Sequence, residues 1–150
     1  MEKLSYEKFL VYLRQFQNKI QKEFNEDLKN FHLSSTYLGI IMMLYDHREG
    51  YSMSDLSRLT SVDNALMTRN IKELEKIDYI YRNRENESQR KYHICLTEKG
   101  QKVAGELKNI IEKRQQDFLK LFSKEEQALL EQAMNIVIQK FITTIKEGEK

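Results

Sequence analysis

The sequence contains no proline and only 5 glycines among its 150 residues. Proline breaks helix interiors and glycine weakens them, so this scarcity indicates a mostly helical chain. The single cysteine, Cys95, excludes an intrachain disulfide framework. No apolar run approaches the roughly 20 residues that cross a bilayer. The N-terminal stretch alternates charged and apolar residues and lacks the layout of a signal peptide. We therefore expect a cytoplasmic protein without membrane contacts.

The total charge of the chain says little about its partners. The length corresponds to about one domain, enough to bury a core. The formal net charge is only +2, which neither supports nor excludes a nucleic-acid partner. Any such inference depends on where individual charged residues lie.

Long amphipathic helices are predicted at both ends of the chain. Between Leu4 and Phe31 apolar residues recur every three or four positions, which predicts a helix roughly 39 Å long. Near the C-terminus, a capping box over Ser123–Glu126 begins a last helix with a wide apolar face. That face comprises Leu129, Leu130, Ala133, Met134, Val137, Phe141 and Ile145. A middle domain of about 25 to 30 Å cannot cover both helices, so we expect a second copy of the chain to cover them in a homodimer.

Three shorter helices are predicted between these ends. The first is expected to begin at Ser34 or Ser35 and to close at Gly50. The second follows one of the serines in the stretch SMSD, and Asp63 is the expected N-cap of the third.

The periodicity changes after Asp78. The segments YIYRNR and KYHICL are rich in Tyr, Ile and Arg, and Tyr92, Ile94 and Leu96 alternate at a spacing of two. This pattern predicts a two-stranded hairpin with the polar tip ENESQR. Thr97 is the expected cap of the helix that follows.

The order of these elements predicts a mainly α fold with a small β-hairpin, a winged helix-turn-helix. Residues 33–97 would form the winged, DNA-binding domain. Residues 1–32 and 98–150 would form a helical dimerisation region.

The third short helix has two chemically different sides. Met67, Ile71 and Leu74 cluster on one side of a helical wheel and suit a core. The other side carries the candidate DNA-contacting residues, which are Asn64, Ala65, Thr68, Arg69 and Lys72. Small residues permit close approach to a major groove, and Arg can bind guanine bidentately. The alternative is an ordinary solvated helix face.

The hairpin adds further basic residues. Arg82, Arg84, Arg90 and Lys91 lie in or beside it, and Arg84, Arg90 and Lys91 are the candidate wing contacts. A basic tip beside a recognition helix can reach the adjacent minor groove or backbone of DNA. The alternative is a charged hairpin that only prevents edge-to-edge aggregation.

The stretch LSRLTSVDNALMTRNIKELEKIDYIYR resembles the helix-turn-helix of the MarR family of bacterial transcriptional regulators, and LTEKG resembles the family's exit from the wing. The resemblance implies a homodimer that binds a palindromic operator, usually as a repressor. In many members of the family a small-molecule effector or an oxidant releases the protein from the DNA. It places the five helix residues above on groove-facing positions and Arg90 on the wing-tip arginine.

Two positions depart from the family pattern. Ser88 stands where the family usually has an Asp. The acid that would orient Arg90 is therefore missing, unless Glu85 or Glu87 substitutes for it. Asp78 stands where the family commonly has Gly after the recognition helix. Because Asp tolerates a left-handed conformation better than most residues, we expect strain there and no change of fold.

Other chemistry is weakly indicated. Cys95 lies between apolar neighbours and is expected to be a packing residue, not an oxidation sensor. The three histidines lack the spacing of a metal site. Four tyrosines are candidates either for a ligand cleft or for the core, namely Tyr6, Tyr12, Tyr37 and Tyr45.

No enzyme motif is present: GxGxxG, P-loop and GxSxG sequences are all missing. We therefore predict a protein that needs no cofactor and catalyses no reaction. The expected partner is double-stranded DNA. The alternative is a helical protein-interaction module on the same fold that does not bind DNA, and the near-neutral charge keeps this alternative open.

Overall fold

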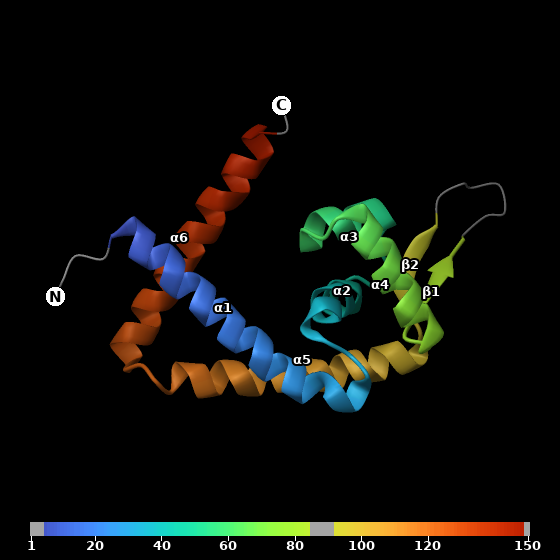
Figure 1. Ribbon diagram of the computed structural model, residues 1–150, viewed down its shortest axis with the longest axis horizontal. Helices are drawn as coiled ribbons and strands as arrows, with labels where there is room; N and C mark the ends of the chain where they lie inside the picture. Colours follow the sequence, from blue (N-terminus) through green and yellow to red (C-terminus); the bar gives the residue numbers. More distant parts are fainter. Residues whose placement is uncertain (1–4, 85–91, 149–150) are drawn as a thin grey trace. The chain divides into compact units, whose positions relative to one another are not determined.

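The computed structural model describes residues 5–84 and 92–148, with side chains described as far as residue 141. It confirms the predicted order of helices and strands (Figure 1). The elements are α1 (Tyr6–Leu28), a 3-10 turn (Lys29–Phe31), α2 (Ser35–Asp46), α3 (Met53–Thr60), α4 (Asn64–Lys76), β1 (Ile80–Asn83), β2 (His93–Leu96), α5 (Glu98–Leu119) and α6 (Lys124–Gly148).

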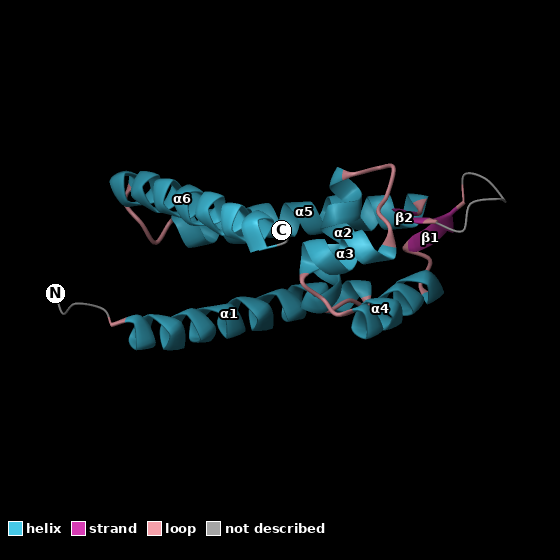
Figure 2. Cartoon of the chain, turned by 90° about the horizontal axis from the view of Figure 1, so that it is seen from above, coloured by secondary structure: helices cyan, strands magenta, loops and turns pink. Residues whose placement is uncertain are grey.

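The chain divides into two compact units, residues 1–110 and 111–150. In the first unit α3 packs against α2 and α4, α2 contacts β2, and the strands adjoin the end of α4 (Figure 2). The hairpin pairs Ile80 with Leu96 at one end and Asn83 with His93 at the other. The winged helix-turn-helix fold predicted from the sequence is therefore confirmed.

One apolar core holds the first unit together. It takes side chains from the end of α1, from α2, α3 and α4, from both strands and from the start of α5. Its fully buried members include Leu28, Ile41, Leu56, Ile71 and Leu107. Each such side chain contributes about 1.5–3 kcal/mol by leaving water, so this core fixes how α4 is presented.

The predicted N-caps are observed at most helix starts. Ser52 accepts a hydrogen bond from the amide of Asp55 (3.1 Å), and Asp63 accepts one from Leu66 (2.9 Å). Thr97 Oγ1 accepts from the amide of Gly100 (2.9 Å). These bonds satisfy amides that have no partner inside the helix.

The predicted N-cap position of α2 is confirmed at Ser34, and the predicted end at Gly50 is wrong. Ser34 occupies the N-cap position without a side-chain bond, and Asn25 of α1 instead accepts from the amide of Ser35 at 2.7 Å. The helix ends at Asp46, before Gly50. Gly50 has φ +75°, and a Cβ there would overlap the carbonyl of Ile94. This glycine therefore serves the close approach of the loop to β2, where Tyr51 and Ile94 exchange backbone hydrogen bonds of 3.2 and 2.8 Å.

Three helical segments end at a residue with a left-handed backbone that is not glycine. His32, Ser61 and Asp78 have φ values of 56°, 54° and 61°. After each, the next amide donates to the carbonyl five residues earlier, as from Tyr79 to Leu74 at 3.0 Å. This is the bond of a Schellman motif, which usually takes glycine. The left-handed conformation expected at Asp78 is confirmed, and the fold is unchanged.

The second unit comprises the end of α5 and α6. Ser123 and Glu126 form the predicted capping box, with reciprocal bonds of 2.8 and 3.2 Å. Gln127 donates to the carbonyls of Leu119 (2.7 Å) and Phe122 (3.1 Å), which ties the connecting turn to α6.

Apolar side chains of α1 and α6 are exposed in the single chain. On α1, Phe9, Leu13 and Phe16 are exposed, and on α6 the side chains of Val137 and Phe141 are each 65% exposed. The side chain of Ile145, also expected on this face, lies outside the described residues. Neither apolar face is covered within its own unit, so both are available for contact with a second copy of the chain in a homodimer.

Candidate nucleic-acid interface

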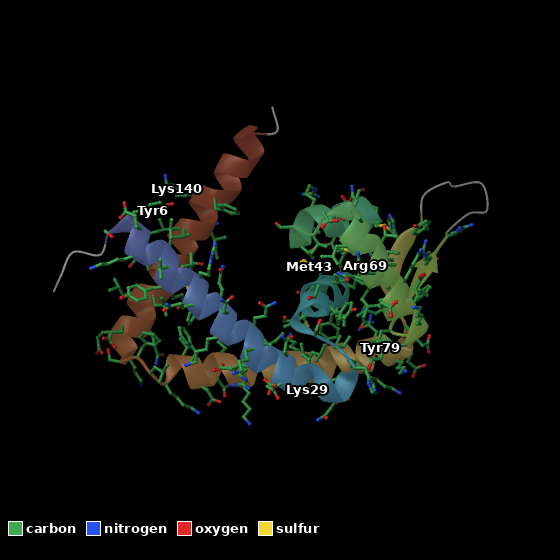
Figure 3. The ribbon with its side chains drawn as sticks, in the orientation of Figure 1. Tyr6, Lys29, Met43, Arg69, Tyr79 and Lys140 are labelled. Atoms are coloured by element: carbon green, nitrogen blue, oxygen red, sulfur yellow. The ribbon has the colours of Figure 1, made fainter. Side chains whose placement is uncertain are left out.

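The orientation of α4 agrees with its predicted two-sided character. Met67, Ile71 and Leu74 are completely buried. Asn64, Ala65, Arg69 and Lys72 are exposed, and Thr68 is half-buried. The core therefore turns the candidate DNA-contacting side of α4 outward, and Arg69 is labelled on this helix in Figure 3.

Thr68 is more constrained than the sequence indicated. Its hydroxyl donates to the carbonyl of Asn64 at 2.8 Å and lies 3.4 Å from the sulfur of Met53 on α3. Because its proton is directed to the helix backbone, only its oxygen lone pairs and methyl group can face a ligand. Such a side chain suits contact with a thymine methyl group or a donor on a base edge.

The charges of α4 divide into paired and unpaired groups. Glu73 binds Lys76 (2.6 Å), and Glu75 binds Arg82 of β1 (2.7 Å). Arg69 and Lys72 have no ion pair or side-chain hydrogen bond in the part of the chain that the structure describes. Both acids of the helix are thus neutralised, and two basic side chains remain free on its exposed side.

The first turn of α4 is also open. Asp63 bonds the amide of Leu66, while the side chains of Asn64 and Ala65 are exposed and small. The other amides of a first helical turn have no partner inside the helix, and the helix dipole favours an anion there. The geometry fits a phosphate oxygen approaching the N-terminus of α4.

The base of the wing differs from the sequence interpretation at one residue. Arg82, grouped there with the basic residues of the hairpin, donates to both carboxylate oxygens of Glu75 (2.7 and 3.1 Å) and to the hydroxyl of Tyr92 (2.8 Å). The hydrogen bond to Glu75 raises the pKa of Arg82 above its ordinary value. The charge of Arg82 is therefore neutralised by Glu75 within the protein and is not available to DNA.

The three candidate wing contacts are only partly described. Arg84 is exposed just beyond β1, and its guanidinium carbon lies 5.9 Å from the centre of the Tyr92 ring. Arg90 and Lys91, and with them Ser88, Glu85 and Glu87, lie outside the described residues. Their contacts with DNA stay predictions.

The LTEKG stretch holds the end of α4. Thr97 donates to the carbonyl of Asp78 (2.6 Å), and Lys99 donates to the carbonyl of Ile77 (2.8 Å). The Tyr79 hydroxyl donates to the carbonyl of Phe31 at 2.9 Å, and Figure 3 labels Tyr79 at this turn. The turn after the recognition helix is thus bound to the 3-10 turn that follows α1 and to the start of α5.

Sequence reasoning missed Glu75, Tyr92 and Lys99 as residues that position the site. The available signal was limited to an acid in the last turn of α4, a base two residues into the hairpin and an aromatic on the opposite strand. Such combinations are common on surfaces, and only the hairpin register brings them together.

The other candidate chemistry is not supported by its surroundings. Cys95 is 3% exposed and its thiol faces the carbonyl of Glu49 at 3.6 Å, which fits a packing residue. The ring of His47 stacks on that of Tyr51, with 4.5 Å between the ring centres. Among residues 5–84 and 92–148 no three potential metal ligands come together, and no helix there could cross a membrane.

An open, mainly apolar groove of about 480 Å³ runs along α1 to the start of α2. Its lining residues are Leu13, Phe16, Gln17, Ile20, Gln21, Phe24 and Ser35. None of the four candidate tyrosines lines this groove: Tyr37 and Tyr45 pack on the core, and Tyr6 and Tyr12 are exposed.

Comparison with known proteins identifies the family. The sequence model of the MarR family matches residues 33–92. The transcriptional regulator SarZ of Staphylococcus epidermidis is 30% identical over 140 residues, 93% of this chain and 91% of SarZ. The Staphylococcus aureus MepR–DNA complex aligns with a TM-score of 0.77 and 18% identity over 89% of this chain and 97% of MepR. Streptococcus pneumoniae FabT in complex with DNA aligns with a TM-score of 0.79 and 20% identity over 93% of this chain and 99% of FabT. The chain belongs to the MarR family of winged helix-turn-helix transcriptional regulators.

Proposed function

We propose that this protein binds a palindromic DNA operator sequence-specifically as a homodimer and regulates transcription as a repressor. The observation that carries the proposal is the charge distribution of α4, where Arg69 and Lys72 are free while both acids are paired. Asn64, Ala65 and Thr68 would complete the reading surface, and Arg84, Arg90 and Lys91 would add wing contacts. The protein would act in the cytoplasm, by binding and without catalysis.

The dimer follows from the exposed apolar faces of α1 and α6. In this proposal residues 1–32 and 98–150 form the dimerisation region and residues 33–97 bind DNA. Two-fold symmetry would present the two α4 helices to successive major grooves, with half-sites about 34–36 Å apart.

Release of the DNA by a small-molecule effector belongs to the same proposal. The groove along α1 has a volume of about 480 Å³, within the range of small-molecule sites. Its lining is mainly apolar with a few polar groups, which fits an apolar or aromatic effector.

The test is fluorescence anisotropy with duplex DNA from upstream of the protein's own gene, with a scrambled duplex as control, titrated across salt. A DNA reader should prefer the upstream duplex and lose affinity steeply as salt rises. Arg69→Ala should cost about 1–3 kcal/mol and relax specificity, and Lys72→Ala should weaken binding to all sequences and lower the salt slope by about 1.

Lys76→Ala is the matched control, because Lys76 lies on the same helix but is paired with Glu73. It should leave both affinity and salt slope nearly unchanged. Unaltered binding by Arg69→Ala would show that the reading face is assigned wrongly. Absence of any DNA binding at low salt would favour the protein-interaction module.

A further inference from the structure

The base of the wing contains a cluster formed by Glu75, Arg82 and Tyr92, which come from three separate parts of the chain. Glu75 lies in the last turn of α4, Arg82 in β1, and Tyr92 immediately before β2. Arg82 donates to both oxygens of Glu75 and to the hydroxyl of Tyr92, and its guanidinium carbon lies 4.8 Å from the centre of the Tyr92 ring. One side chain thus joins the recognition helix to both sides of the hairpin.

Arg82 is not arranged to bind phosphate. Its side chain and that of Glu75 are each 30% exposed, and their bidentate pair uses the planar fork that would otherwise grip a phosphate. Binding DNA through Arg82 would break three charge-assisted or polar bonds. The residue is better suited to fix geometry than to contact DNA.

A hairpin this short needs such a connection. Its two strands pair over only four residues each, and although Ile80, Ile94 and Leu96 are buried in the core, the outer pair of Asn83 and His93 is not. A two-stranded hairpin without such packing is only marginally stable in water. Because binding costs the entropy of every group that it orders, a wing held in place beforehand binds DNA more tightly than a mobile one.

Arg84 completes the arrangement. It is exposed, it lies on the Tyr92 ring at 5.9 Å, and it has no acidic partner within the described ranges. An aromatic face attracts a guanidinium without neutralising its charge, so the ring can orient Arg84 and leave its donors available.

We propose that Glu75, Arg82 and Tyr92 are positioning residues that fix the wing to the recognition helix and hold Arg84 as a DNA-contacting cation. The proposal rests on the proposed function for its DNA readout. The acid Glu75 therefore supports DNA binding even though it carries the wrong charge for a direct contact.

The decisive variant is Glu75→Ala, with Glu73→Ala as its matched control. Both remove one carboxylate from α4, but only Glu75 holds Arg82, since Glu73 pairs with Lys76. Removing an acid near DNA should by itself leave affinity unchanged or slightly raise it, as expected for Glu73→Ala. Glu75→Ala should instead weaken operator binding about three- to tenfold. If Glu75→Ala bound as tightly as Glu73→Ala or tighter, Arg82 would be a latent DNA contact and the proposal would be overturned.

A double-mutant cycle tests the role of Tyr92. Tyr92→Leu should weaken operator binding about as much as Arg84→Ala does, and adding Arg84→Ala to Tyr92→Leu should cost little more. Tyr92→Phe keeps the ring and should lose less than Tyr92→Leu. Full additivity of the two losses would refute the inference that the ring holds Arg84.

Hydrogen–deuterium exchange of the free protein supplies a readout independent of DNA. Glu75→Ala should speed exchange of the strand amides in β1 and β2 and leave those of α2 at the wild-type rate. Unchanged exchange in the strands would overturn the connection between helix and wing. If the wild-type protein bound no DNA, the proposed function would fail, and this exchange experiment would still decide whether the cluster holds the wing.

Discussion

The left-handed backbone conformation of the residue after the recognition helix leads to a specific prediction about stability. Asp78 has φ +61°, and its amide donates to the carbonyl of Glu75 at 3.0 Å. Its carboxylate forms no hydrogen bond or ion pair with any described residue. Substitution at this position therefore changes the backbone preference without removing a side-chain contact.

The size of the effect follows from two opposing terms. An L residue such as Ala costs roughly 1–2 kcal/mol in the left-handed conformation, where Gly is unstrained. Gly loses about 0.4–1 kcal/mol more backbone entropy on folding. Asp78→Gly should therefore exceed Asp78→Ala in free energy of unfolding by about 0.5–1 kcal/mol, with the wild type between them. This difference corresponds to about 1–4 °C in Tm.

Urea unfolding at one fixed protein concentration measures the difference, because a dimer's stability depends on concentration. Asp46 provides the control, since it is exposed and is the last residue of α2 with an ordinary helical backbone. There Ala should be more stable than Gly by up to about 1 kcal/mol. If the Asp78 pair followed the same order as the Asp46 pair, the account of the helix end would be refuted.

Two further predictions concern polar groups of the winged domain. Asn70 is 3% exposed, and its Nδ2 has no hydrogen-bond partner among the described residues. Asn70→Leu should therefore raise the free energy of unfolding, measured by urea titration, by about 1 kcal/mol. A lower free energy of unfolding in this variant would refute the prediction. The hydrogen bond from Ser52 lowers the pKa of Asp55 below its ordinary value. The ionised carboxylate should therefore stabilise the fold by about 0.3–1 kcal/mol at neutral pH, an advantage lost as the pH falls through the lower, folded pKa. The Tm of Asp55→Asn should approach that of wild type at low pH, and a gap independent of pH would contradict this.

Features that depend on a few neighbouring residues were predictable from the sequence. The caps at Ser52, Asp63 and Thr97 and the capping box at Ser123 each involve atoms three residues apart. The buried and exposed sides of α4 followed from helical periodicity for the same reason, since burial of Met67 and Ile71 fixes where Arg69 and Lys72 point.

Features that depend on distant residues were not predictable in this way. Ser34 occupies the N-cap position of α2 as predicted, but the side chain that accepts from this helix start is that of Asn25, ten residues away. Gly50 lies where it does because Ile94 approaches its backbone, and this contact arises only when the hairpin packs against the loop.

The sequence by itself determined the winged helix-turn-helix, the outward side of the recognition helix and its two basic residues, because periodicity and capping act over one or two helical turns. Only the tertiary structure decided which basic residues keep their charge available. Arg82 lies in β1 and Arg84 lies two residues later, just beyond the strand, yet Arg82 meets Glu75 and Arg84 does not. That outcome depends on the register of the hairpin and its packing against α4, which place three side chains separated by up to 17 positions within hydrogen-bonding distance.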